Sequence, residues 1–105
     1  MQEIDIVYTM SYIIMEFEWD EEKYFANLLK HRIRFEDATE VWLDEYSIEF
    51  FDAKNSIEEE RWIRLGYAKN TGFLTVVYAE RGAKIRIISC RKSTKAERVY
   101  YERRV

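Results

Sequence analysis

The chain has no proline, a single cysteine and no apolar run of membrane-spanning length. Without proline or low-complexity sequence, a disordered tail or an interdomain linker is excluded. Cys90 cannot form a disulfide within the chain, so we expect a buried thiol in a reducing compartment. The apolar run Tyr12 to Met15 is too short to cross a membrane, and Glu3 and Asp5 stand where a signal peptide needs positive charge. These features predict a cytoplasmic protein.

Aromatic side chains, in contrast, are plentiful. The 105 residues include three tryptophans, eight tyrosines and six phenylalanines. A single domain of this length buries only about 65% of the surface that its unfolded chain exposes, so large side chains must fill its core. We therefore assign most aromatic residues to packing rather than to base stacking, and keep Tyr100 and Tyr101 as candidates for exposed contacts.

Charge is divided unevenly along the chain. Residues 1–60 carry 17 acidic and five basic side chains, whereas residues 61–105 carry three acidic and 12 basic ones. The net charge of −3 argues against indiscriminate binding of nucleic acid. The basic half nevertheless predicts a surface for a polyanion or an acidic partner, and the alternative is a solvated surface without a ligand.

The first part of the chain predicts one strand and two helices. Tyr12 to Trp19 alternates as a strand does, and Asp20 then caps a helix that runs to about Lys30. A second, short helix begins near Phe35. The expected buried stripes are Phe25, Leu28 and Leu29 on the first helix and Phe35, Ala38, Val41 and Trp42 on the second.

The rest of the chain predicts four strands and a final helix. Apolar residues alternate at Tyr46, Ile48 and Phe50, at Ile63, Leu65 and Tyr67, at Leu74, Val76 and Tyr78, and at Ile85 and Ile87. Glycine in segments 70–72 and 81–82 favours tight hairpins, so the last three strands should form an antiparallel meander. The predicted order is β-α-α-β-β-β-β-α, an α+β domain with a twisted antiparallel sheet and helices packed on one face.

The segment from Lys84 to Tyr101 joins a cationic strand to a cationic helix through a short polar turn. Thr94 and Glu97 fit a capping box that starts this helix. Arg91 would then lie beside the helix N-terminus, where unpaired N–H groups and the macrodipole favour an anion. The pattern predicts a composite site for phosphate.

An ordered set of residues spread over the chain resembles the BrnT toxin family. The set comprises Phe17-Glu18-Trp19-Asp20, Lys23, Asn27, Lys30-His31, Phe35, Ala38, Asp52, Ser56, Glu60-Arg61-Trp62, Gly66, Ile87-Ile88-Ser89-Cys90-Arg91-Lys92, Glu97 and Tyr101. The resemblance implies a compact ribonuclease toxin with a RelE-like fold. It also implies a ribbon-helix-helix antitoxin of the BrnA type, which neutralises the toxin. Toxin and antitoxin together would repress their operon, and only the antitoxin would contact operator DNA. The resemblance begins at Met15, which makes 15–105 the toxin domain and 1–14 an N-terminal extension or an upstream start.

The chain departs from the common pattern of this family in two ways. Asn55 stands where a histidine commonly precedes Ser56, and Cys90 and Ser93 stand where alanine is common. Without that histidine one proton carrier is missing, so activity is either weakened or rests on His31.

Cleaving RNA without a metal requires a proton acceptor for a ribose 2′-hydroxyl, positive charge at the phosphorane-like transition state and a proton donor for the departing 5′-oxygen. Arg61 and Arg91 suit the second task, because a guanidinium stays charged and offers forked donors to phosphate oxygens. For proton transfer, His31 is a candidate because imidazole exchanges protons near neutral pH. Glu60 is a second candidate, either with a raised pKa or as an ionised base. The predicted catalytic residues are thus His31, Glu60, Arg61 and Arg91.

Each candidate also has a purely structural alternative. His31 suits the negative end of a helix dipole, Glu60 suits a cross-strand pair with an arginine, and Arg61 suits a surface strand. Lys23 and Asn27 lie four residues apart and share one face of the first helix. This face either contacts RNA or the antitoxin, or it faces solvent. The candidates for RNA binding are Lys30, Arg86, Lys92, Lys95 and Tyr101. No cysteine or histidine spacing fits a metal site, so we expect neither a metal nor a cofactor.

The sequence alone leaves other function classes open. A non-catalytic module would hold nucleic acid or an acidic protein without cutting RNA, and a structural protein would do neither. For the toxin, we expect RNA and antitoxin to compete for the basic half of the chain. The alternative is an apolar groove for the antitoxin, with the basic surface left to RNA.

Overall fold

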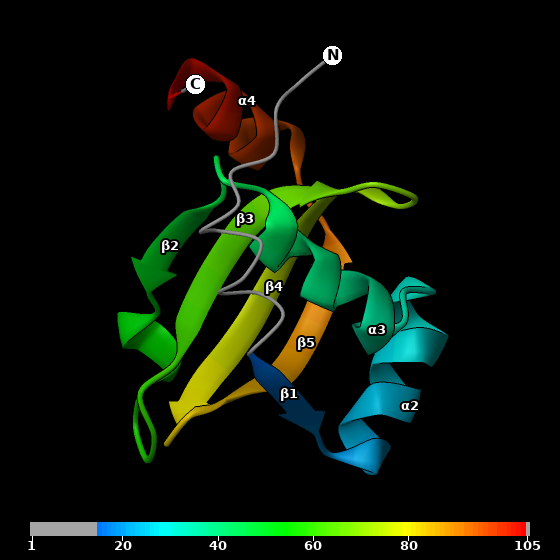
Figure 1. The fold of residues 1–105 in the computed structure, drawn as a ribbon, viewed down its shortest axis with the longest axis vertical. Helices are drawn as coiled ribbons and strands as arrows, with labels where there is room; N and C mark the ends of the chain where they lie inside the picture. Colours follow the sequence, from blue (N-terminus) through cyan, green and yellow to red (C-terminus); the bar gives the residue numbers. More distant parts are fainter. Residues whose placement is uncertain (1–14, 105) are drawn as a thin grey trace.

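The computed structural model describes residues 15–104, which form a five-stranded sheet with helices against it (Figure 1). Its elements follow the predicted order, with two 3-10 helices inserted, so the α+β class is confirmed. The elements are β1 (Glu16–Trp19), α2 (Glu21–His31), α3 (Phe35–Ala38), the 3-10 helix η1 (Thr39–Leu43), β2 (Ile48–Phe51), the 3-10 helix η2 (Ala53–Asn55), β3 (Trp62–Ala68), β4 (Gly72–Arg81), β5 (Lys84–Lys92) and α4 (Lys95–Arg104). The predicted strand start at Tyr12 and the predicted extension 1–14 lie outside the described residues.

The strand order in the sheet is β1-β5-β4-β3-β2. β3, β4 and β5 form the predicted antiparallel meander, and Gly72 and Gly82 adopt the positive φ angles of 95° and 61° that suit tight turns. The prediction of a wholly antiparallel sheet was wrong, because β1 pairs parallel to β5. Most of the domain separates these two strands along the chain, so no hairpin forces them to run in opposite directions.

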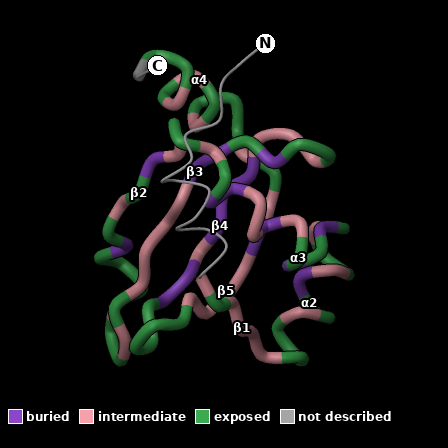
Figure 2. Tube along the Cα trace, viewed as in Figure 1, coloured by how far each residue is buried: buried purple, intermediate pink, exposed green. Residues whose placement is uncertain are grey.

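We call one side of the sheet the core face, defined by the buried residues Leu74, Val76, Tyr78, Ile87 and Cys90. α3 and η1 cover this face and bury the four apolar residues predicted for the second helix. The Trp42 ring meets the Tyr78 ring edge-on, with centroids 4.9 Å apart. A Cβ on Gly66 would lie 2.5 Å from Val41 Cγ1, so glycine lets η1 approach β3 closely. Figure 2 shows the buried segments on the central strands and on α3.

We call the opposite side the pocket face, defined by Phe50, Phe73, Thr75, Ser89 and Arg91, which alternate with core residues in the strand registers. α4 packs on this face. The Tyr100 ring lies 5.4 Å from that of Phe50, and the Tyr101 ring lies 5.3 Å from that of Phe73. The prediction that all helices pack on one face was therefore wrong, because aromatic residues on both faces require cover.

α2 presents a different face to the sheet from the one predicted. Asp20 caps its first turn as expected, and Arg32 ends it in the left-handed conformation with a φ of 61°. Phe25 and Leu29, however, are 60% and 73% exposed, whereas Asn27 is buried. The helix turns a polar side chain inward because that side chain bonds to β5, as described below. No helix in the described part of the chain is long and apolar enough to cross a membrane.

Candidate active site

An open pocket of about 520 Å³ lies on the pocket face, between α2 and β5. Its wall comes from α2, its floor from β5 and one further side chain from the residue before β3. The lining residues are Lys23, Ala26, Asn27, Lys30, His31, Arg61, Ile88, Ser89 and Arg91. The lining therefore contains four basic side chains and the single histidine of the chain, and none of the described residues in it is acidic.

A bulge in β5 shapes the floor of the pocket. Val77 lies opposite Ser89 while Tyr78 lies opposite Ile87, so Ile88 is an extra residue in β5. Before the bulge Ile87 faces the core, and after it Cys90 does. The shift of alternation directs Ser89 and Arg91 to the pocket face.

The wall of the pocket is fastened to the floor by Asn27. Its side-chain oxygen accepts from the Cys90 backbone N–H at 3.0 Å, and its amide nitrogen donates to the Cys90 carbonyl oxygen at 2.8 Å. The same nitrogen donates to the Ile33 carbonyl oxygen at 3.3 Å, which ties down the chain after α2. Asn27 is therefore a structural residue, and not the solvated or ligand-contacting one considered from the sequence.

A compact loop holds Arg61 beside the pocket. The Arg61 backbone N–H donates to Ser56 Oγ at 2.8 Å, and the Arg61 carbonyl oxygen accepts from the Asp52 N–H at 2.8 Å. Asn55 belongs to the same loop, where its side-chain amide donates to the Asp52 carboxylate at 3.0 Å. Asn55 is exposed and does not line the pocket, so the position that commonly carries histidine in the family lies outside this site.

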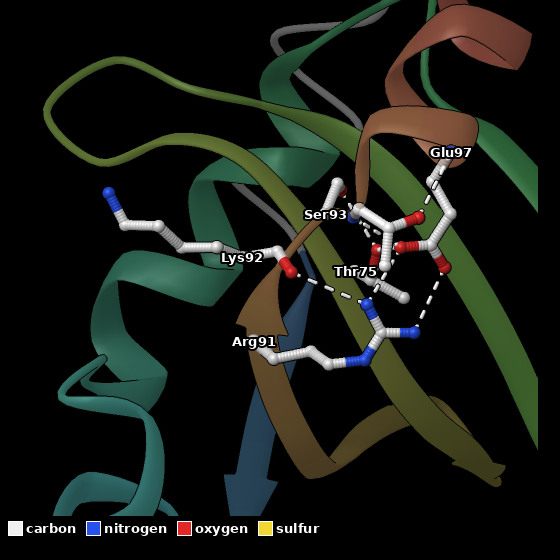
Figure 3. Close-up of polar contacts among 6 residues, drawn as sticks. Thr75, Arg91, Lys92, Ser93 and Glu97 are labelled. Atoms are coloured by element: carbon white, nitrogen blue, oxygen red, sulfur yellow. Dashed lines mark hydrogen bonds and ion pairs between the residues drawn. The ribbon is translucent and has the colours of Figure 1, made fainter.

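Arg91 is held in the pocket by Glu97 of α4 (Figure 3). Arg91 Nη1 and Nη2 donate to Glu97 Oε1 and Oε2 at 2.7 and 2.9 Å. The Thr94 N–H donates to Glu97 Oε1 at 2.7 Å, and the Glu97 N–H donates to Thr94 Oγ1 at 3.2 Å, which confirms the capping box. The bonds from Arg91, aided by the Thr94 N–H, lower the pKa of Glu97 to about 2 against the opposing effect of burial.

This geometry differs from the predicted phosphate site in the turn before α4. The Glu97 carboxylate itself occupies the place beside the helix N-terminus that we assigned to a phosphate. A capping box brings its own anion to that place, so free N–H groups and a free guanidinium are not both left for a ligand. Any anion bound by Arg91 must approach from the pocket side.

The structure gathers four of the predicted site residues in the pocket, namely Lys30, His31, Arg61 and Arg91. The others are placed elsewhere. Arg86 Nε donates to Glu18 Oε1 of β1 at 3.3 Å, and the Tyr101 hydroxyl donates to Asp44 Oδ2 at 2.6 Å. The remaining three are exposed and do not line the pocket: Glu60, Lys92 and Lys95.

Alternation along β5 explains one of these outcomes. Lys92 follows Arg91 in this strand, and adjacent residues of a strand point to opposite faces. Glu60 lies in the loop before β3. Sequence reasoning also underrated Lys23 and did not single out Ser89. Lys23 lies seven residues before Lys30, two turns along the same face of α2, and this spacing was the available signal.

Potential metal ligands are not grouped in the described residues. Residues 15–104 contain no group of three or more histidine, cysteine, aspartate or glutamate side chains that could hold a metal ion together. The pocket lining supplies one imidazole and no carboxylate, which is a poor donor set for a divalent cation.

Comparison with known proteins agrees with this architecture. Residues 19–97 match the family described as "Ribonuclease toxin, BrnT, of type II toxin-antitoxin system". The chain belongs to this family. The crystal structure of the Brucella abortus ribonuclease toxin BrnT is similar, with a TM-score of 0.59 and 21% identity over 77% of this chain and 99% of that one. None of the curated proteins compared matches the chain. Membership in the BrnT family makes this a type II toxin whose partner is an antitoxin.

Proposed function

We propose that this BrnT-family chain is a metal-independent endoribonuclease whose active site is the pocket between α2 and β5. One observation carries the proposal. An acid-free pocket brings His31, Arg61 and Arg91 together from three separate parts of the chain. Such a lining attracts a phosphodiester and supplies both fixed positive charge and a group that exchanges protons.

The reaction is an internal transesterification of RNA. The ribose 2′-oxygen loses its proton and bonds to the adjacent phosphorus, while the bond from phosphorus to the 5′-oxygen breaks and that oxygen takes a proton. The products are a 2′,3′-cyclic phosphate end and a 5′-hydroxyl end. His31 accepts or donates the transferred protons, because it is the one imidazole in the lining. Arg61 and Arg91 stabilise the extra negative charge on the phosphate oxygens.

The two lysines of α2 extend the site along the substrate. Lys23 and Lys30 lie on the wall of the pocket, about 10 Å apart along the helix at 1.5 Å per residue. A lysine is a compact charge that suits backbone phosphates without reading bases. We therefore assign Lys23 and Lys30 to the phosphates that flank the cleaved bond.

A cleavage assay in EDTA tests the proposal. The purified chain should cut single-stranded RNA in EDTA and leave cyclic phosphate ends. Lys30→Ala should weaken RNA binding, whereas Lys92→Ala, a matched change outside the pocket, should not. Cleavage that disappears in EDTA would contradict metal independence, and a folded protein that binds RNA without cutting it would favour the non-catalytic module.

We also infer that the antitoxin is a ribbon-helix-helix protein that covers this pocket. The support is the resemblance to BrnT toxins together with the concentrated positive charge of the lining, which suits an acidic segment. Lys30→Glu should then weaken both RNA and antitoxin binding, and association should slow as salt rises. Lys95→Glu is the control, because Lys95 is exposed outside the pocket. If Lys30→Glu abolishes RNA binding and leaves antitoxin affinity intact, the two ligands use different surfaces.

A further inference from the structure

The Glu97 carboxylate receives more hydrogen bonds than a helix cap requires. A capping box needs only the bond from the Thr94 N–H. Glu97 Oε1 also accepts from Arg91 Nη1 at 2.7 Å and from Thr75 Oγ1 at 3.1 Å, and Oε2 accepts from Arg91 Nη2 at 2.9 Å. Ser93 Oγ lies 2.8 Å from the same Thr75 hydroxyl. Groups from β4, β5 and the turn before α4 thus fix one carboxylate.

These bonds use one side of the Arg91 guanidinium and leave the other side available. A guanidinium has five N–H groups. Nη1 donates to Glu97 and, at 3.3 Å, to the Lys92 carbonyl oxygen, while Nη2 donates once to Glu97. The Nε–H and the second Nη2–H have no acceptor among the described residues. Figure 3 shows the Nε edge turned away from Glu97 and from the Lys92 carbonyl. These two N–H groups form the kind of fork that binds two oxygens of one phosphate.

We propose that Glu97 is a positioning residue, which clamps one edge of Arg91 so that the opposite Nε–Nη2 edge faces the scissile phosphate in the pocket. This inference rests on the proposed function. Without the clamp, the Arg91 side chain samples many rotamers. The positive charges of Lys23, Lys30 and Arg61 then repel it toward solvent. With the clamp, the fork is oriented before substrate arrives, and orientation of this kind raises the rate of the chemical step.

The proposal predicts a characteristic separation of kinetic constants. Glu97→Gln removes one negative charge next to a cationic pocket, so RNA should bind as tightly as before or more tightly. The same change releases Arg91, so kcat should fall by about tenfold, as expected when a transition-state contact loses its orientation. If the carboxylate served only as a helix cap, its loss would lower stability and could lower KM through the change of charge, but kcat would stay the same.

Thr94→Ala supplies the matched control. It removes the other half of the capping box, the bond from the Glu97 N–H to Thr94 Oγ1, and leaves the pair of Arg91 with Glu97 in place. We expect Thr94→Ala to lower the melting temperature by about 5 °C and to leave kcat and KM within about twofold of wild type. An equal loss of kcat in Thr94→Ala and Glu97→Gln would overturn the proposal, as would an unchanged kcat in Glu97→Gln.

A measurement that does not need turnover separates this inference from the proposed function. The Nε–H resonance of Arg91 can be followed by NMR during titration with a 2′-O-methyl RNA dinucleotide, which cannot be cleaved. It should shift strongly in wild type and in Thr94→Ala, and weakly or not at all in Glu97→Gln. If the wild-type protein neither cuts RNA nor shows a shift of the Arg91 resonance, both the proposed active site and the positioning role of Glu97 are wrong. An identical shift in Glu97→Gln would overturn the positioning role alone.

Discussion

The two faces of the sheet each carry an arginine paired with a glutamate, and the two pairs differ in what surrounds them. On the core face, Arg64 Nη2 donates to Glu49 Oε2 at 3.2 Å, and Nη1 donates to Ser47 Oγ at 2.7 Å. The guanidinium lies over the Trp42 ring, 5.0 Å from its centroid, and 5.9 Å from that of Tyr78. The Tyr78 hydroxyl also donates to Glu49, and burial raises its pKa.

On the pocket face, the pair of Arg91 with Glu97 is more open. The Arg91 side chain is 41% exposed, against 18% for Arg64. Arg64 lies against aromatic rings and contributes to packing, whereas Arg91 lines an open pocket. Arg64 Nε also lacks a hydrogen-bond partner, but it is buried. The comparison teaches that unused hydrogen-bonding capacity in an ion pair indicates function only where a ligand can reach it.

Removing Arg91 should have the largest effect on activity. We expect Arg91→Ala to lower kcat/KM by about 10²-fold or more, because a donor to the transition-state phosphate is lost. The fold should persist, since the side chain is partly exposed and Glu97 keeps its bonds to Thr94 and Thr75. Cleavage kinetics together with circular dichroism measure both quantities. An unchanged rate would remove Arg91 from the site.

Removing the charge of Arg64 should produce the reverse pattern. Arg64→Met keeps much of the apolar stem but loses the bonds to Glu49 and Ser47 and the contact with Trp42. We expect the free energy of unfolding to fall by about 2 kcal/mol. kcat/KM of the folded protein should not change. Urea denaturation and cleavage assays test this, and a loss of activity without a loss of stability would contradict the assignment of Arg64 to packing.

Acid should weaken the pair of Arg91 with Glu97 on the pocket face. The pKa of Glu97 is lowered in the folded chain, so its contribution is complete above the unfolded value of 4.5 and is lost as pH falls toward about 2. We expect this loss to be about 1 kcal/mol, because the pair is partly open to solvent. Unfolding followed from pH 6 to pH 2 should show a smaller acid destabilisation in Glu97→Gln than in wild type. Equal slopes would show that Glu97 is not the group being titrated.

The smallest effect concerns Cys90, the core-face neighbour of Arg91 in β5. Burial raises the pKa of the Cys90 thiol to about 12, so little thiolate forms at neutral pH. We expect iodoacetamide to label Cys90 only after unfolding, and we expect Cys90→Ala to leave cleavage unchanged. Mass spectrometry of native and urea-treated protein provides the test. Rapid labelling of the native chain would show that the core face opens.

The elements predicted well were those that depend on local pattern. Alternation located β3, β4 and β5. Asp20 as an N-cap and the capping box of Thr94 with Glu97 marked the helix starts, and the structure shows both caps. Helix periodicity, however, says which residues share a face and not which face meets the sheet. The sequence therefore indicated Phe25 and Leu29 for the interior of α2, where the structure places Asn27. Nothing local could reveal that an amide would find Cys90, 63 residues away.

The candidate site was predictable only in part for the same reason. Residue chemistry selected His31, Arg61 and Arg91, and the structure places all three in one pocket. We predicted a phosphate site at the N-terminus of α4. The Glu97 side chain that caps this helix is itself an anion and takes that place. The bulge at Ile88 leaves no mark in composition, yet it determines which side chains of β5 reach the pocket.

The hydrogen bonds between the Asn27 side chain and the Cys90 backbone also protect the edge of the sheet against pairing with other copies of the chain. β1 pairs with β5 only from Lys84 to Ile87, so among residues 15–104 the second half of β5 has no strand on that side. An open strand edge invites pairing with other chains and thus aggregation. Asn27 engages both backbone groups of Cys90, as a neighbouring strand would, and so blocks this edge with one side chain. Asn27 thus occupies the strand edge at Cys90, while the pocket beside it stays open.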